Sequence, residues 1–508
     1  MATAMNSRQR FFLTVAVMAS TVMQVLDTTI VNVALPQMQG ELGASPDQIS
    51  WVLTSYLVAS AIMMPLTGFF SDRIGRKKYL LISIAGFVAA SMLCGIAQNI
   101  TEIVLFRILQ GMFGAALVPL AQAIMVSTYP LEERARAMSI WAMGVMVGPI
   151  AGPTLGGWLT EALDWRWTFF INLPVGILSF ILALRYVPDT ERQLRKMDWT
   201  GFVLLGLAIG GLQYFLDRGN GDDWFSSTGI TVAAIIGVSS LVLFLWHSLR
   251  GREHPLFSLK IFADRNFVTS SLVITALGFG MYGAMVLQPT MLEGLLAYPV
   301  ATAGLVMAPR GIASMASMLI VSGLMKRFDA RWIIMTGMLL SAMGNYLCTQ
   351  FNLDVSAWQI VLPSLLQGFG LGLMMVPLTT IALSTMAPKL IPDASGVYSL
   401  LRTLGSSMGI ALISTLYARE SQMNWQTLGS GIQPFNHNLQ NYLMHLPGAS
   451  TGSAAGISQI VSELSHQAAM VAMVNAYWWI TASFVLMLPL VFLLKPLNKG
   501  AKPAEVSE

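Results

Sequence analysis

Long apolar runs dominate this sequence, and they restrict the chain to one class of fold. A helix of roughly 20 apolar residues crosses a hydrocarbon core about 30 Å thick, and a window of that length finds fourteen candidate spans in the 508 residues. Only 11% of the residues are charged, against about 25% in a soluble globular protein. The sequence therefore predicts an all-α integral membrane protein, with spans near 11–35, 51–70, 79–97, 103–127, 137–160, 168–187, 199–216, 229–249, 267–291, 302–324, 331–350, 358–384, 396–417 and 471–494.

The distribution of positive charge predicts how these spans are oriented. If the N-terminus lies inside, 23 of the 29 lysines and arginines fall in inner segments, 3 in outer segments and 3 within spans. This split follows the positive-inside rule and places both termini in the cytoplasm. The first apolar run is too long for a cleaved signal peptide, so we expect it to remain as a helix. Because topology accounts for the net charge of +4, the charge does not indicate a nucleic-acid partner.

Two similar stretches indicate an internal repeat. "LLQGFGLGLMMVPL" at 365–378 resembles "ILQGMFGAALVPL" at 108–120, and their Gln-Gly pairs are offset by 257 residues. The offset corresponds to eight spans, which predicts a 6+2+6 arrangement: a six-helix half at 1–190, two inserted helices at 191–260 and a second half at 261–508. Transporters built from repeats bind substrate between the halves near the membrane midplane. Chance similarity of two glycine-rich helices is the alternative.

The outer segment at about 418–470 is the one long connection. It carries two amphipathic stretches, one with Leu439, Leu443 and Leu446 and one with Ile457, Ile460, Val461 and Leu464. Such a segment could cap the mouth of a cavity, or it could present a face to an extracytoplasmic partner.

Of the 25 acidic residues, only Asp27 lies well inside an apolar span. Insertion scales put the cost of an aspartate at the membrane centre at roughly 2.5–3.5 kcal/mol. A carboxylate at this depth is therefore a candidate for binding a proton from one side of the membrane and releasing it to the other. The structural alternative is a polar contact with Thr28, with Asn32 or with a neighbouring helix.

Arg107 is the natural counter-charge for Asp27. Counted from the outer ends of their spans at 1.5 Å per residue, the depths of the two residues differ by only about 6 Å, so an ion pair is feasible. The alternative is that Arg107 extends to the membrane surface. Arg310 and Arg402 also lie within spans, and either extends to a surface or lines the cavity. Gln110, in the repeated Gln-Gly pair, is a third candidate for the cavity lining.

"GFFSDRIGRKKYL" at 68–80 joins the second and third spans on the predicted inner face. Its two glycines permit close approach and a tight turn, and its acid can accept bonds from arginines or a helix N-terminus. A basic loop that only sets topology is the alternative. The spacing is more specific than charge alone and predicts an inner gate formed by Gly68, Asp72, Arg73, Gly75 and Arg76.

"GVMVGPIAGPTLGGWL" at 144–159 repeats glycine every four residues. Such a strip lets another helix approach closely, and its two prolines remove backbone hydrogen bonds and should bend the helix. We expect a bent, closely packed helix whose key residues are Gly144, Gly148, Pro149, Gly152, Pro153, Gly156 and Gly157. Ordinary close packing is the alternative.

Metal and disulfide chemistry have little support. Cys94 and Cys348 both lie within apolar spans, and the five histidines show no metal-ligand spacing. The sequence therefore indicates neither a metal nor another cofactor.

These stretches together resemble the major facilitator superfamily, and within it the fourteen-span drug:proton antiporters of EmrB and QacA type. "LDTTIVNVALP" (26–36) resembles that family's first-helix motif, and the 68–80 loop resembles the superfamily signature, departing at Phe70 and Ser71. "RILQGMFGAA" (107–116) is similar to the fourth-span motif, and the strip at 144–157 to the antiporter motif of the fifth span. "WRWTFFINLPVG" (165–176) and "HPLFSLKIFADRNF" (254–267) are also similar to family stretches.

The resemblance implies proton-driven export of hydrophobic or amphipathic drugs across a bacterial inner membrane by alternating access, and hence antibiotic resistance. It assigns proton coupling to Asp27, assisted by Arg107, the inner gate to Asp72 and Arg76, and rocking to Pro149 with its glycines. The outer segment looks more like the Gram-negative EmrB branch, which implies a periplasmic membrane-fusion adaptor and a TolC-like outer-membrane channel as partners. The second-half counterpart of the inner loop, "GLMKRFDAR" at 323–331, is degenerate, so no gate residues transfer there.

Other functions fit the sequence less well. A nutrient symporter would need the same fold and could use the same Asp27, but the Gly-Pro strip argues against it. No G-x4-G-K-[ST] phosphate loop supports an ATP-driven pump. No nucleophile-base pair or G-x-S-x-G elbow supports an enzyme. A sensor with this fold would bind drugs without moving them.

Overall fold

The computed structural model describes residues 6–190, 192, 196–250, 256–432, 436–437 and 454–495. Within these residues every regular element is helical. Thirteen helices are long and apolar enough to cross a membrane. The fourteenth predicted span, near 331–350, is also a helix, α14 (Ala330–Cys348), and it packs between α15 and α18 without reaching the same apolarity. The prediction of an all-α, many-span membrane protein is thus confirmed.

The first six predicted spans form nine α-helices, because three spans are interrupted, the sixth of them between Phe170 and Asn172. The second span breaks near Pro65 and the fourth just before Pro119, where proline removes a backbone donor. The elements are α1 (Ser7–Glu41), α2 (Pro46–Met63), η1 (Met64–Leu66), α3 (Thr67–Ile74), α4 (Arg76–Ile96), α5 (Ile100–Gly114), α6 (Leu117–Thr128), η2 (Leu131–Glu133), α7 (Arg134–Ala162), α8 (Trp167–Phe170) and α9 (Asn172–Tyr186).

The later spans repeat this packing. The elements are η4 (Leu259–Ala263), α12 (Arg265–Pro289), η5 (Thr290–Leu295), α13 (Val300–Arg327), α14, α15 (Ala357–Ser384), α16 (Ile391–Ser430) and α18 (Ala454–Val491). Helix α1 packs along α7 as α12 packs along α16, and α4 packs against α5 and α9 as α14 packs against α15 and α18. This repeated helix packing is a separate observation from the similarity of the two Gln-Gly stretches, and it supports the same internal repeat. The exact division at 190 and 260 remains a prediction.

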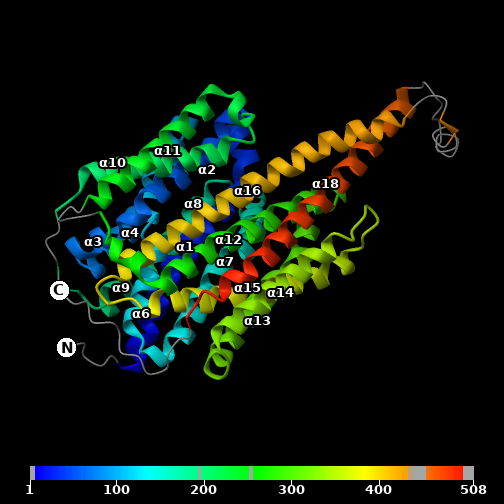
Figure 1. Ribbon diagram of the computed structural model, residues 1–508. Coiled ribbons are helices and arrows are strands. Elements are labelled where there is room, and N and C mark those ends of the chain that lie inside the picture. The colour runs from blue at the N-terminus through cyan, green and yellow to red at the C-terminus, as the bar shows by residue number, and fades with distance from the viewer. Residues whose placement is uncertain are drawn as a thin grey trace.

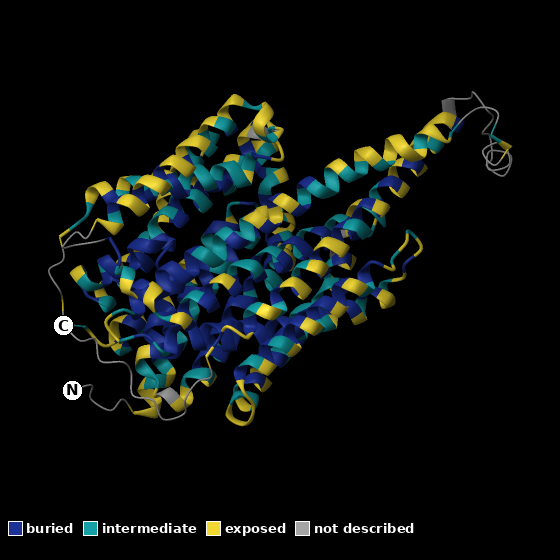
Figure 2. Ribbon diagram, viewed as in Figure 1, coloured by how far each residue is buried: buried dark blue, intermediate teal, exposed yellow. Residues whose placement is uncertain are grey.

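Two further helices lie on one side of the bundle. Helices α10 (Trp199–Arg218) and α11 (Thr228–Leu249), joined through η3 (Trp224–Ser226), pack against each other (Figure 1). Helix α10 also contacts α2 and α16, while much of α11 is exposed, including Ile235 and Val242 (Figure 2). In a membrane these exposed apolar side chains would face lipid.

The long outer segment differs from the expected loop. Helix α16 continues to Ser430 and α18 begins at Ala454, so most of the described part of 418–470 is helical. With 40 residues, α16 is about 60 Å long at 1.5 Å per residue, about twice the hydrocarbon thickness. The two helices project together beyond the bundle instead of folding over it (Figure 1). The predicted stretch at 439–446 lies outside the described residues.

The end of the bundle at which α1 begins is called the inner end here, because the charge pattern predicts that it faces the cytoplasm. At this end the two halves meet through buried contacts. Ser399 of α16 donates to Gln122 of α6 at 3.4 Å, and the side chain of Asp393, at the start of α16, packs against Gly68 of α3. Arg134 of α7 donates to the Ser384 carbonyl at 3.5 Å. The halves are therefore in contact across the inner end in this structure.

Candidate functional site

Asp27 lies in the middle of α1 with 1% of its surface exposed, and it is fully satisfied by hydrogen bonds from two other helices. Arg107 Nη1 of α5 donates to Asp27 Oδ2 at 2.6 Å. Gln110 Nε2 of α5 and Asn172 Nδ2 of α9 each donate to Asp27 Oδ1 at 2.8 Å. Three donors, one of them charged, stabilise the ionised carboxylate.

Arg107 does not extend to the membrane surface, because its guanidinium is completely buried. Its Nε donates to the Val52 carbonyl at 3.0 Å and its Nη1 also donates to Gln110 Oε1 at 2.8 Å. The Tyr56 ring lies 4.2 Å from the guanidinium carbon, within the range of a cation–π contact. Arg107 Nη2 has no hydrogen-bond partner among the described residues.

A second layer of polar groups orients the donors. Asn172 Nδ2 also donates to Ser91 Oγ at 2.9 Å, and Ser91 Oγ donates to the Phe169 carbonyl at 2.9 Å. Gln24 Nε2 donates to the Tyr56 hydroxyl at 3.0 Å. The ion pair is thus held by polar side chains from α1, α2, α4, α5 and α9.

The glycine strip of α7 contacts α1, the helix that carries Asp27. A Cβ at Gly148 would lie 2.6 Å from Val25 Cγ1 and 2.8 Å from the Val25 carbonyl oxygen, and Thr29 Oγ1 donates to the Gly148 carbonyl at 3.0 Å. Gly144 faces Met18 and Gly156 faces Ile30 in the same way, and Gly152 faces Thr29. Gly157 has no heavy atom within 4 Å of the equivalent position, so it is not part of this contact. Pro149 and Pro153 both lie inside α7.

The inner-loop residues form a turn at the inner end. Gly75 adopts φ +93°, a conformation that favours glycine, and ends α3 directly before α4. Arg76 donates through its backbone nitrogen to Thr190 Oγ1 at 2.9 Å and through Nη1 to Ser127 Oγ at 2.7 Å. Arg73 lies over the Phe69 ring at 5.8 Å. The loop thereby ties α3 and α4 to the inner end of α6 and to the segment that follows α9.

The other two in-span arginines lie in the second half. Arg310 of α13 points to the interior, where Nη1 lies 3.5 Å from Gln288 Oε1 and Nη2 lies 3.4 Å from the Met281 carbonyl. Arg402 of α16 is partly buried. Neither has a carboxylate within 4.0 Å among the described residues.

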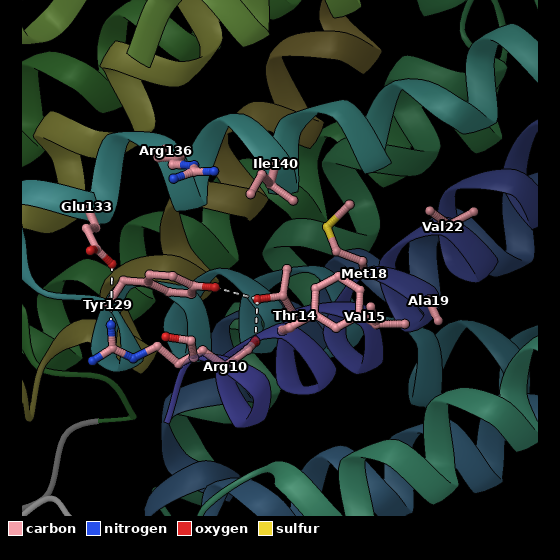
Figure 3. Close-up of a pocket in the computed structure, with 12 residues that line it drawn as sticks. Arg10, Thr14, Val15, Met18, Ala19, Val22, Tyr129, Glu133, Arg136 and Ile140 are labelled. Carbon is pink, nitrogen blue, oxygen red and sulfur yellow. Dashed lines mark hydrogen bonds and ion pairs between the residues drawn. The ribbon is translucent and has the colours of Figure 1, made fainter. Parts of the chain in front are cut away.

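A crevice of about 650 Å³ lies between α1 and the inner part of α7. Figure 3 shows its polar mouth, where Arg10 pairs with Glu133 at 3.4 Å, and its apolar wall along α1, formed by Val15, Met18 and Val22. Its volume is typical of small-molecule pockets, and so is the combination of apolar walls with a few polar groups. Met18 and Val22 of this wall also lie against Gly144 of the glycine strip.

Sequence reasoning missed several members of the buried network. Asn172, Tyr56, Gln24 and Ser91 were not singled out, although each is a polar side chain within an apolar span. Asp393 was missed as well, because it lies at a span end where acids are common. A search for buried polar residues in every span would have found the first four.

Comparison with known proteins identifies the chain's family. Residues 17–410 match the family model described as Major Facilitator Superfamily. The chain belongs to the major facilitator superfamily. The fold agrees: the proton:xylose symporter XylE, bound to 6-bromo-6-deoxy-D-glucose, superposes with a TM-score of 0.61 at 16% identity, covering 96% of each chain. This superfamily and its fold are those of transporters rather than enzymes.

Within this superfamily the chain is similar to named efflux proteins of Gram-negative bacteria. It is 37% identical over 479 residues to the fatty acid resistance protein FarB of Neisseria gonorrhoeae, covering 93% of this chain and 94% of FarB. It is 33% identical over 499 residues to the multidrug export protein EmrB of Escherichia coli (strain K12), covering 97% of this chain and 96% of EmrB. The predicted resemblance to the EmrB branch is confirmed.

Proposed function

We propose that this protein is a proton-coupled efflux transporter that exports hydrophobic or amphipathic compounds, including drugs, by alternating access. The buried Asp27–Arg107 pair carries the proposal, because it supplies a titratable group at the centre of one half of a transporter fold. The names of the relatives, multidrug export for EmrB and fatty acid resistance for FarB, support substrates of this class.

The geometry explains why proton binding would be coupled to movement. A proton on Asp27 neutralises the carboxylate and leaves Arg107 as a buried cation without its counter-charge. Breaking a buried ion pair by removing one partner costs about 3–5 kcal/mol. The protonated state is therefore relieved by a rearrangement that lets Arg107 find another acceptor, and α1 can transmit that rearrangement to α7 through the glycine strip.

In this mechanism the inner gate is the turn with Gly68, Asp72, Arg73, Gly75 and Arg76. Its contact with Asp393 would open when the halves rock, and α7, with Pro149 and Pro153, would be the element that bends. Compounds dissolved in the inner leaflet could enter through the α1–α7 crevice, whose apolar wall suits them (Figure 3).

We further propose the inner membrane of a Gram-negative bacterium as the location, with both termini in the cytoplasm, and a membrane-fusion adaptor with a TolC-like channel as partners. The α16–α18 projection supports the adaptor. It exposes large apolar side chains beyond the bundle, among them Met423, Trp425 and Ile457, and exposed apolar surface of this kind marks interaction sites.

The test is proton movement driven by drug in proteoliposomes, compared between wild type and Asp27→Asn after both are shown to be folded. We expect coupled flux to fall to background in Asp27→Asn while substrate binding persists. The matched control is Glu41→Gln, which removes a partly exposed carboxylate from the end of the same helix and should retain flux. Unchanged flux in Asp27→Asn would show that Asp27 is structural, and uptake together with protons would indicate a symporter.

A further inference from the structure

The second half contains a counterpart of the Asp27 network, and the positions of its charges differ. In the first half, Cys94 Sγ donates to Gln110 Oε1 at 3.6 Å; in the second, Gln367 Nε2 donates to Cys348 Sγ at 3.5 Å. Gln367 also donates to Asn345, which occupies the place of Ser91, three residues before the cysteine. The repeat therefore extends to individual buried polar side chains.

The ion pair has no equivalent in this second network. Gln288 on α12 and Ser364 on α15, at the places corresponding to Asp27 and Arg107, form a neutral hydrogen bond of 2.8 Å. The positive charge has moved to α13. The backbone of Arg310 faces Gly368 as the backbone of Tyr56 faces Gly111, so Arg310 takes the place of the tyrosine that covers Arg107.

Arg310 is weakly satisfied for a guanidinium in the interior. Its two hydrogen bonds, at 3.4 and 3.5 Å, are at the long limit of such bonds, whereas those of Arg107 are 2.6 to 3.0 Å. The ionisable groups near it are Tyr477 and Cys348, which are neutral at ordinary pH. A buried charge is costly unless it is paired, so Arg310 lacks an anion.

Arg310 is also accessible enough to receive one. Its guanidinium reaches Gln288 and Met281 of α12 and lies near groups of α14 and α18, yet the residue keeps intermediate exposure, unlike Gln288, which is 4% exposed. A guanidinium presents paired N–H donors that match the two oxygens of a carboxylate.

We infer that Arg310 is a specificity-determining residue that holds the acid group of monoanionic amphipathic substrates. The inference rests on the proposed function and deepens it. Arg107 cannot have this role while Asp27 neutralises it, so the two halves divide the work: the first binds the proton and the second binds the substrate anion.

The test measures binding, so it does not depend on transport. The probe is a dansyl-labelled undecanoate, whose fluorescence reports binding to the purified protein in nanodiscs, compared with its methyl ester and with dodecyltrimethylammonium as competitors. Wild type should prefer the acid to the ester by about 10- to 100-fold, the range expected for a charged hydrogen bond. Arg310→Gln should abolish this preference and still bind the ester, and Arg310→Lys should retain part of it.

Arg402→Gln is the matched comparison, because it removes another in-span arginine without an ion pair. An equal loss of preference in Arg402→Gln and Arg310→Gln would overturn the inference, since a general positive field would then explain the selectivity. A preference that survives Arg310→Gln would overturn it too. The proposed function has a separate readout, which is drug-driven proton movement by the wild type. If that movement is observed, a negative binding result contradicts only the role of Arg310. If it is not observed, the proposed function is wrong whatever the binding result.

Discussion

At the residue scale, the central feature is the buried ion pair of Asp27 and Arg107. Arg107 depends on Asp27 for its charge balance more than Asp27 depends on Arg107 for its hydrogen bonds. Asp27 has three donors, two of them neutral amides, and would remain hydrogen-bonded without Arg107. Among the described residues, Arg107 has only Asp27 as a counter-charge. Loss of the acid therefore leaves a buried cation, and loss of the arginine leaves the acid with its two amide donors.

This asymmetry predicts the outcome of a double-mutant cycle. Asp27→Asn should destabilise the protein by about 3–5 kcal/mol, because it leaves Arg107 unpaired. The double variant Asp27→Asn with Arg107→Gln removes both charges and should be more stable than Asp27→Asn alone. Thermal unfolding of the purified variants measures the difference. Additive destabilisation by the two changes would contradict the proposed dependence of Arg107 on Asp27.

Asp27, Arg107 and Gln110 could be predicted as site residues from sequence, whereas the role of Asn172 could not. Asp27 and Arg107 are conspicuous because charges are costly in a span, and their depths could be compared by counting residues. Asn172 is 145 residues from Asp27 along the chain, and an amide side chain in a span can serve many structural purposes. Only the packing of α9 against α1 shows that the Asn172 amide donates to Asp27.

At the element scale, α7 connects Asp27 to the second half of the molecule. It packs against α1, which carries Asp27, and against α13 of the second half. Helix α7 touches α1 through its glycines and touches α13 of the second half elsewhere, where Ile150 lies against Gly311. The second half repeats the arrangement: Gly405 and Gly409 of α16 lie against the backbone of α12. Each half thus has one glycine-faced helix pair.

Gly148→Val should impair transport by separating α1 from α7. The new side chain would meet the Val25 backbone, which cannot move aside as a flexible side chain can. Overpacking of this kind costs about 1–3 kcal/mol, and drug-driven proton flux should fall at least tenfold. The control is Gly157→Ala, where the added methyl group meets open space and flux should be retained. Normal flux in a folded Gly148→Val variant would show that close approach is not needed.

Apolar periodicity located the spans at this scale but could not show their interruptions or extensions. The breaks near Pro65 and Pro119 fall inside apolar sequence, where proline is tolerated in membrane helices. The extension of α16 to Ser430 is polar enough to resemble a loop, and its helix is stabilised by packing along α18. That contact joins segments far apart in sequence, which a local pattern does not record.

At the scale of the whole molecule, the two halves are joined at the inner end by contacts that alternating access must break. Gln122→Cys combined with Ser399→Cys places thiols on side chains that are hydrogen-bonded here. We expect a short bis-methanethiosulfonate cross-linker to join the two thiols and stop transport, and reduction to restore it, as measured by flux before and after each treatment. The two single variants serve as controls, and the native cysteines lie in the separate networks of the two halves, so they should not be cross-linked to each other. Full flux with the cross-link formed would show that this contact does not open.

Away from the ends of the predicted spans lie three arginines, Arg107, Arg310 and Arg402, and one aspartate, Asp27, and this imbalance has an electrical meaning. Moving one elementary charge through a potential of 100 mV is worth about 2.3 kcal/mol. Export of a monoanion in exchange for one entering proton moves two charges in the same electrical sense, so each cycle gains about 4.6 kcal/mol per 100 mV, negative inside. A neutral compound gains half as much, and a monocation gains nothing. An unpaired arginine such as Arg310 would then decide how much of the energy of export comes from the membrane voltage, in addition to deciding which compound leaves.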